Sequence, residues 1–240
     1  MPRHSVLLAT DNSKAVAAIT AYFSDTDSIP SVIRSKGDCA VLFSSKPNFV
    51  FFQGDWVDSK MTARLIQFKK EYSKAKFFTL GEAASPGFAW DGSVEFPVDE
   101  KNFRKAVLAK TEFPKPVRLL IMSGKPQLVG SVRDYFEARQ NPDFQVLDAA
   151  NEAGTLKHFG SDSPHCLLID LSTVSGAGDI FHRLEEKGFH IPTIVFTHPS
   201  GMDQILELRK RKAPIFMELD RLSDSMPDLL AAVKKLIIFS

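Results

Sequence analysis

The 240-residue sequence is poor in cysteine and tryptophan, with two of each, and neither sign of charge dominates it. The cysteines, Cys39 and Cys166, lie one in each half, so no disulfide framework and no paired-cysteine zinc site is expected. Thirty basic against twenty-nine acidic residues leave no overall field that would draw the chain to nucleic acid or to an acidic membrane surface. We expect no nucleic-acid or membrane partner, no bound metal and no cofactor.

Long apolar runs are also missing. No stretch near Met1 is long enough for a signal peptide, and none elsewhere could span a membrane, so we expect a cytoplasmic protein. Apolar residues make up 44% of the chain and charged residues 25%, which is ordinary for a folded protein. The length suits one large domain or two of ordinary size.

What the sequence does contain is a repeat. Segments 47–53 and 164–170 each begin with proline, continue with mostly apolar residues and end on a polar residue, Gln53 in the first copy and Asp170 in the second. A later apolar run in each half ends on threonine. Two copies of one α/β unit explain this pattern.

The boundary between the copies falls at the segment 112–116, whose two prolines are too close together for a helix to pass through. We therefore predict two domains, at residues 1–113 and 114–240.

The second half alternates between short apolar runs and helical periodicities. The predicted strands cover residues 118–122, 144–147, 166–169, 193–196 and 215–217, and the predicted helices cover 127–138, 152–159, 178–187, 202–210 and 225–238. Strands that are apolar on both faces and alternate with helices are typical of a parallel sheet covered on both sides. Active residues of such sheets gather at the carboxyl ends of the strands.

The first half follows the same order with one departure. Residues 81–92, which follow the fourth apolar run, are rich in Gly, Ala and Ser and lead within about a dozen residues to the next strand, predicted at 93–96. We therefore expect the fourth helix of this half to be reduced or lost, and a last helix at 101–109.

This order of segments resembles the receiver domain of bacterial two-component response regulators, a doubly wound five-stranded α/β domain that accepts a phosphoryl group on an aspartate. The resemblance covers nearly the whole chain and is clearest in the second half. It implies that Asp170 stands at the phosphoacceptor position and that Gly178 is the glycine eight residues later. Thr197 corresponds to the Thr or Ser that ends the fourth strand of the family.

The second half departs from the family at the residues that support phosphotransfer. Receivers hold Mg²⁺ with an acidic pair directly after the first strand, where this half has Ser123 and Gly124. The family's lysine after the fifth strand falls on Leu219 or its neighbours, none of which is lysine. Without carboxylates beside Asp170 a divalent cation would lose most of its oxygen ligands, so efficient phosphotransfer there is not expected.

The first half departs further. Asp11 remains at one position of the acidic pair and Thr79 ends the fourth strand. The third strand, however, ends in Gln53, an amide that cannot form an acyl phosphate, and Phe96 stands where the resemblance places the lysine. We interpret both halves as degenerate, pseudo-receiver domains.

These features favour a non-catalytic signalling adaptor or scaffold that acts by phosphorylation-independent contacts with signalling proteins. Receivers commonly pair through the fourth helix, fifth strand and fifth helix, which implies self-association through the second half. The interface residues that we predict are Arg209, Arg211, Leu229 and Val233. No catalytic residues are predicted, nor a DNA-binding, cyclase or kinase output for this chain.

Two other functions stay open from the sequence. Asp170 could be the phosphoacceptor of a working phospho-switch, with Asp148, Asp179 or Asp220 as substitute metal ligands. The altered pocket below Asp170 could instead hold a small molecule. Each residue also has a simpler interpretation: Asp170 as a strand-end carboxylate or helix cap, and the basic run at 209–212 as a solvated helix end.

Overall fold

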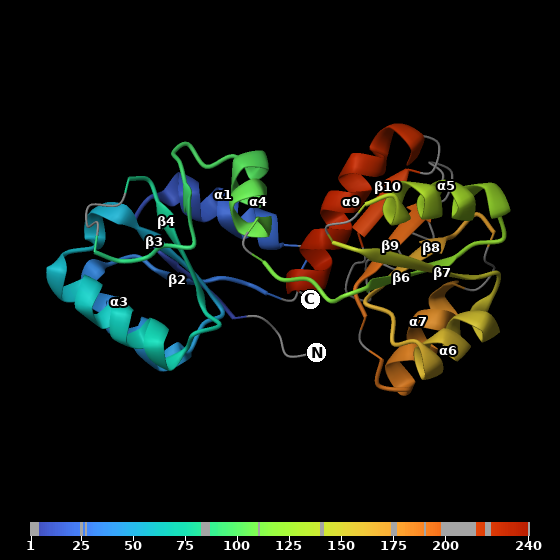
Figure 1. Ribbon diagram of the computed structural model, residues 1–240, viewed down its shortest axis with the longest axis horizontal. Helices are drawn as coiled ribbons and strands as arrows, with labels where there is room; N and C mark the ends of the chain where they lie inside the picture. The colour runs from blue at the N-terminus through green and yellow to red at the C-terminus, as the bar shows by residue number, and fades with distance from the viewer. Residues whose placement is uncertain are drawn as a thin grey trace. The chain divides into compact units, whose positions relative to one another are not determined.

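In the computed structural model, backbone packing divides the chain into two compact units (Figure 1). The first unit contains Pro2–Glu112 together with Phe239, and the second contains Phe113–Ile238. The structure describes residues 5–24, 26, 28–82, 87–109, 111–139, 142–173, 177–189, 191–197, 215–218 and 222–239.

The first unit is built on a five-stranded sheet in the order β2-β1-β3-β4-β5, with every neighbouring pair parallel. The strands are β1 (Val6–Ala9), β2 (Ser31–Ile33), β3 (Phe49–Gln53), β4 (Lys76–Leu80) and β5 (Gly92–Val94). The helices are α1 (Ser13–Phe23), η1 (Lys36–Cys39), α2 (Ala40–Ser45), η2 (Gly54–Trp56), α3 (Ser59–Glu71) and α4 (Glu100–Leu108).

The second unit repeats this sheet, in the order β10-β9-β8-β6-β7 and again parallel throughout. Its strands are β6 (Val117–Met122), β7 (Phe144–Ala149), β8 (Cys166–Asp170), β9 (Thr193–Thr197) and β10 (Ile215–Glu218). Its helices are α5 (Pro126–Glu137), α6 (Glu152–Ser161), α7 (Ala177–Glu186) and α9 (Leu222–Phe239). Counted within each unit, the strand order is 2-1-3-4-5, which confirms the predicted pair of doubly wound parallel sheets.

Helices cover both faces of the second sheet, as the continuous apolar runs predicted (Figure 1). Leu119 and Ile121 of β6 belong to the cluster that includes buried side chains of α5 and α9. The intervening Leu120, together with Met122, belongs to the cluster that includes side chains of α6 and α7. Successive residues of β6 from Leu119 to Met122 therefore bury their side chains on opposite faces, and all four are apolar.

The described part of the link between β4 and β5 packs against α3 and β4. None of its described residues, 81–82 and 87–91, is helical, which agrees with the predicted loss of the fourth helix. Asp91 accepts a hydrogen bond from the backbone N–H of Phe77 in β4 at 2.8 Å and forms an ion pair with Lys69 of α3, also at 2.8 Å. The Lys69 ammonium lies 5.4 Å from the ring centre of Phe88. Packing between this loop, β4 and α3 replaces the contacts that a helix would make.

Two predicted helices of the second unit differ from the structure or fall outside it. The last helix begins at Leu222, so Pro227 lies inside it and not in its first turn. The prediction started this helix near residue 225 because proline is common in the first turn of a helix. That preference is a statistical tendency and does not fix where a helix begins. The predicted helix at 202–210 falls outside the described residues.

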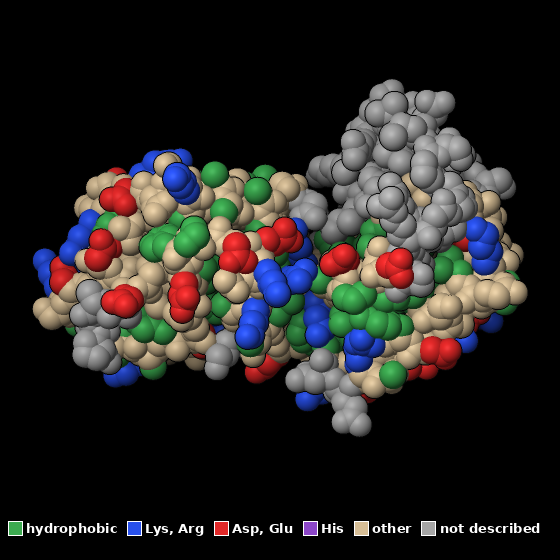
Figure 2. Space-filling model, turned by 90° about the horizontal axis from the view of Figure 1, so that it is seen from above, with side chains coloured by type: hydrophobic (Ala, Val, Ile, Leu, Met, Phe, Trp, Pro, Cys, Tyr) green, Lys and Arg blue, Asp and Glu red, His purple; other side chains and the backbone are tan. Residues whose placement is uncertain are grey.

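On the face drawn in Figure 2, acidic and basic side chains are interspersed and not gathered by sign. Among the helices that the structure describes, none combines the length and the apolar character needed to cross a bilayer.

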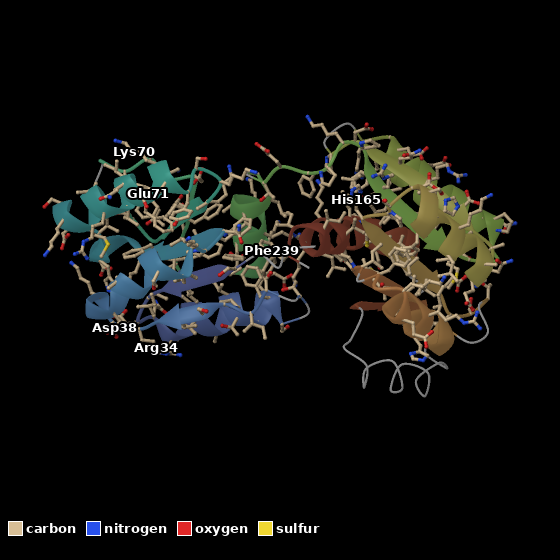
Figure 3. All side chains as sticks on the ribbon, turned by 90° about the horizontal axis from the view of Figure 1, so that it is seen from below. Arg34, Asp38, Lys70, Glu71, His165 and Phe239 are labelled. Atoms are coloured by element: carbon tan, nitrogen blue, oxygen red, sulfur yellow. The ribbon has the colours of Figure 1, made fainter. Side chains whose placement is uncertain are left out.

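His165 stands immediately before β8 and ties that strand to β6 (Figure 3). Its ring Nδ1 accepts a hydrogen bond from the backbone N–H of Arg118 at 2.9 Å, and its own backbone N–H donates to the carbonyl of Arg118 at 2.8 Å. Burial of the ring and the nearby charge of Arg118 lower the pKa of His165. The imidazole is therefore a neutral acceptor in the folded chain.

Acidification below a pH of about 6.5, the usual pKa of an unfolded histidine, is expected to destabilise the second unit. Because the folded pKa is lower, the unfolded chain binds the proton first. The contribution of His165 is complete above that pH and is lost as the pH falls toward the folded pKa. His165→Asn keeps an acceptor near the position of Nδ1 but does not titrate, so its urea midpoint should change less with pH than that of the wild type.

The matched control is His182→Asn on α7, because the side chain of His182 is 64% exposed and its contact with Glu186 is an exposed ion pair, which contributes little to stability. Its urea midpoint should follow the wild-type pH dependence. A His165→Asn curve parallel to the wild-type curve would show that His165 does not carry this effect.

Candidate functional site

The candidate site lies where the order of strands reverses in the second sheet. Strand β8 pairs with β6, and Ile169 lies opposite Met122 in the register, so the residues that follow these two strands meet at the carboxyl edge. Ligands of open α/β sheets bind at such a switch point. Asp170, the last residue of β8, is located there and is fully buried.

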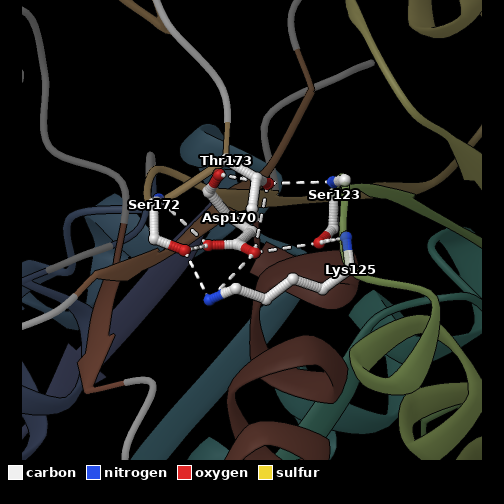
Figure 4. A network of polar contacts seen from close by, with 6 residues as sticks. Ser123, Lys125, Asp170, Ser172 and Thr173 are labelled. Atoms are coloured by element: carbon white, nitrogen blue, oxygen red, sulfur yellow. Dashed lines mark hydrogen bonds and ion pairs between the residues drawn. The ribbon is translucent and has the colours of Figure 1, made fainter.

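Both carboxylate oxygens of Asp170 are bound by donors from the chain itself (Figure 4). Oδ1 accepts hydrogen bonds from the backbone N–H of Ser172 at 3.0 Å and from its hydroxyl at 2.5 Å. Oδ2 accepts hydrogen bonds from the hydroxyl of Ser123 at 2.9 Å and from that of Thr173 at 3.2 Å. A buried carboxylate requires such partners, and here local donors supply them.

Lys125 brings a positive charge to the same cluster. Its Nζ lies 3.9 Å from Oδ2 of Asp170 and donates a hydrogen bond to the hydroxyl of Ser172 at 2.7 Å, while its side chain is 39% exposed. The ammonium is therefore close enough to Asp170 for a direct electrostatic attraction in partly buried surroundings.

Further bonds join the two loops that form the cluster. The backbone N–H of Gly124 donates to the hydroxyl of Thr173 at 2.8 Å, and that of Lys125 donates to the hydroxyl of Ser123 at 3.0 Å. A Cβ atom on Gly124 would lie only 3.2 Å from Cβ of Thr173, so the loop after β6 packs closely on the loop after β8.

The residues around Asp170 do not fit a divalent cation. Mg²⁺ is usually held through carboxylates, and among the described residues here, hydroxyls surround one carboxylate that already faces an ammonium. Among the described residues no three His, Cys, Asp or Glu side chains gather as a possible metal site. Of the predicted substitute ligands, Asp148 forms an ion pair with Arg133. The side chain of Asp179 and all of Asp220 lie outside the described residues.

The other predicted residues of this site are placed as follows. Thr197 is buried at the end of β9. Phe196, the residue before it in the strand, pairs with Asp170 in the sheet register. Gly178 is the second residue of α7. The position that the resemblance assigns to the lysine, Leu219, lies outside the described residues.

The first unit uses the same arrangement without charge. The hydroxyl of Thr10, directly after β1, donates to Oε1 of Gln53 at 2.5 Å, and the backbone N–H of Asp11 donates to the same oxygen at 3.2 Å. The backbone N–H of Asn12 donates to the hydroxyl of Thr10 at 3.1 Å. Thr10 therefore corresponds to Ser123 in its contacts, Gln53 to Asp170 and Asn12 to Lys125.

Beyond Gln53, the loop after β3 packs closely against the loop after β4. A Cβ atom built on Gly54 would lie 1.9 Å from the backbone oxygen of Glu82, which only glycine can accommodate. Thr79 is buried and donates its hydroxyl to the carbonyl of Gly81 at 3.2 Å. The loops after β3 and β4 therefore contact each other, and the hydroxyl of Thr79 has a partner inside the chain.

Two of the four predicted interface residues need correction. Leu229 and Val233 are both fully buried in the core between α9 and the sheet. Their spacing of four places them on the apolar face of the helix, which the sheet covers, so their side chains cannot contact a partner. Arg209 and Arg211 lie outside the described residues.

Sequence reasoning noted Ser123 only as a missing carboxylate and did not assign Lys125, Ser172 or Thr173 to the site. A usable signal was present, because these residues directly follow the two strands that flank the switch point. In a parallel sheet of this order such residues converge whatever their chemistry.

No protein-family model matches the sequence, and no curated protein matches it. Several solved structures align with most of the chain. Two are response regulator/GGDEF domain proteins of two-component systems. One is 11% identical to this chain, with a TM-score of 0.43. The alignment covers 96% of this chain and 98% of the other. The second is 12% identical with a TM-score of 0.41 and coverages of 97% and 100%.

A third structure is the C-terminal part of RcsC from E. coli, with its linker and phosphoreceiver domain. It is 12% identical with a TM-score of 0.37, and 97% of this chain and 94% of the other are covered. All three TM-scores lie below 0.5.

Asp170→Ala is expected to destabilise the second unit by about 1–3 kcal/mol, because it leaves the hydroxyls of Ser123 and Thr173 without their acceptor. Urea unfolding followed by circular dichroism would measure the loss. Asp134→Ala, at an exposed position of α5, is the control and should change the free energy of unfolding by less than about 0.5 kcal/mol. Equal midpoints for the two variants would mean that the Asp170 contacts do not stabilise the unit.

Proposed function

We propose that this chain is a non-catalytic signalling adaptor of two-component type, whose two receiver-like units act through phosphorylation-independent contacts with other proteins. The observation that supports it most strongly is the condition of Asp170. This carboxylate is fully buried and both of its oxygens accept hydrogen bonds from the chain's own donors.

Phosphoryl transfer to Asp170 would have to undo this arrangement. One carboxylate oxygen must leave its donors to attack phosphorus, and each hydrogen bond to a charged group contributes about 1.5–3 kcal/mol. The product would place a doubly charged phosphoryl group among hydroxyls and one ammonium, without the carboxylate set that binds a metal. The geometry favours Asp170 as a structural anchor of the loops.

The first unit offers no replacement acceptor at the equivalent position. Gln53 has an amide in place of the carboxylate, and the next residue, Gly54, packs closely against the backbone of Glu82. Neither unit therefore supports a phosphoryl-dependent switch, and the surfaces of the two units are what the protein offers to partners.

Within the second unit, we assign partner contact or self-association to the outer side of α9 and to the segment 202–212. Asp224 and Asp228 are exposed on α9, whereas Leu229 faces the core. Signalling proteins are the proposed partners, and the two units are proposed as the separate domains 1–113 and 114–240.

Titration with Mg²⁺, with and without beryllofluoride as a phosphoryl mimic, tests the proposed function. Amide NMR signals around Asp170 and Thr197 are expected to stay unshifted up to millimolar Mg²⁺, because the carboxylate is already bound. Localised shifts at that edge, absent in Asp170→Asn, would overturn the proposal and establish a phospho-switch.

Charge reversal tests the proposed interface. Arg209→Glu combined with Arg211→Glu is expected to weaken association of the second unit, seen in the full chain as a later gel-filtration volume, because like charges would then face acidic side chains of the partner. Lys157→Glu on α6 changes charge at an exposed position outside this surface and serves as the control. Association unchanged by the double substitution would exclude these arginines from the interface.

A further inference from the structure

The buried charge of Asp170 has one cationic neighbour among the described residues around it. Ser123, Ser172 and Thr173 contribute neutral hydroxyls, and Lys125 contributes the ammonium, 3.9 Å from Oδ2. Hydroxyls satisfy hydrogen bonding but do not neutralise a carboxylate, and a buried uncompensated charge is costly. Lys125 therefore compensates the negative charge of Asp170, which the neutral hydroxyls cannot do.

The two units provide an internal comparison. In each, a hydroxyl directly after the first strand donates to the residue that ends the third strand and accepts from the backbone N–H two residues later. In the first unit the residue two places on is the uncharged Asn12, and its counterpart across the site is the uncharged Gln53. In the second unit the same two positions hold Lys125 and Asp170. Charge is thus present at both positions or at neither.

We infer that Lys125 is the resident counter-ion of the Asp170 pocket, a built-in cation at the place where receiver-like folds would take a divalent metal. This inference rests on the proposed function and names the residue that makes the site independent of a metal ion. One ammonium balances one carboxylate, and the pair leaves no net charge to attract Mg²⁺ or to accommodate a phosphoryl group.

The ammonium also acts mechanically. Lys125 belongs to the loop after β6, and it donates to Ser172 in the loop after β8 at 2.7 Å. Together with the bond from Gly124 to Thr173, this contact fixes the two loops to each other. The second unit consequently presents one loop arrangement to partners, without a ligand to set it.

A double-mutant cycle on the full chain tests this inference. Lys125→Met removes the charge with little change in side-chain length, and Asp170→Asn removes the opposite charge. Each single variant is expected to lower the folded-to-unfolded ratio of the second unit roughly tenfold or more, as loss of one partner of a partly buried ion pair does. The double variant reproduces the uncharged pair of the first unit and should recover most of that ratio.

The control is Lys157→Met on α6, an exposed lysine, which should leave the ratio within about twofold of wild type. A Lys125→Met effect no larger than the control, or effects that simply add in the double variant, would overturn the counter-ion role.

Mg²⁺ provides a second readout in the same variants. Lys125→Met leaves a buried carboxylate without its cation, so its amide signals at Ser123 and Asp170 should shift with Mg²⁺ while the wild-type signals stay unshifted. If Lys125 and Asp170 are coupled in the double-mutant cycle and beryllofluoride also shifts the wild-type signals, the proposed function would be overturned but the ion pair would stand. Absence of coupling with no such shifts would overturn only the role of Lys125.

Discussion

The burial of one carboxylate constrains the rest of the second unit's functional edge. Asp170 ends a strand between β6 and β9, beside the fully buried Met122 and Phe196, and is itself fully buried, so its charge has no solvent to stabilise it. The chain must bring donors and a cation to it, and both come from the two loops at the switch point. The bonds that join the two loops and the close approach of Gly124 to Thr173 both follow from meeting that requirement.

The first unit meets a weaker form of the same requirement. Gln53 carries no charge, so a hydroxyl from Thr10 and one backbone N–H are sufficient partners for its amide oxygen. The loops after β3 and β4 then close directly on each other at Gly54. The two copies of one fold therefore meet this requirement by different means: the residue that ends the third strand is an uncharged amide in one copy and an internally paired carboxylate in the other.

The sequence predicted the fold well because the fold depends on patterns that survive substitution. Continuous apolar strands such as Cys166–Asp170 and the alternation with helices are enough to predict a doubly wound parallel sheet, and the short Gly-rich link after Leu80 was enough to predict the missing helix. The site was less predictable. Asp170 could be identified from its place at the end of the third strand. A pattern of residue types does not show that the Lys125 side chain reaches Asp170, or that the hydroxyls of Ser172 and Thr173 donate to its carboxylate. The prediction for Leu229 and Val233 was wrong for a different reason. Apolar residues at helical spacing identify the buried face of α9, whereas an interface requires its exposed face.

A crystal structure of the wild-type protein grown with Mg²⁺ and beryllofluoride would test the central claim most directly. Our account predicts Lys125 Nζ at ion-pair distance from Asp170, both carboxylate oxygens bound to Ser123, Ser172 and Thr173, and no metal or fluoride density between them. A magnesium ion coordinated by Asp170, with beryllofluoride attached and Lys125 turned away, would contradict it.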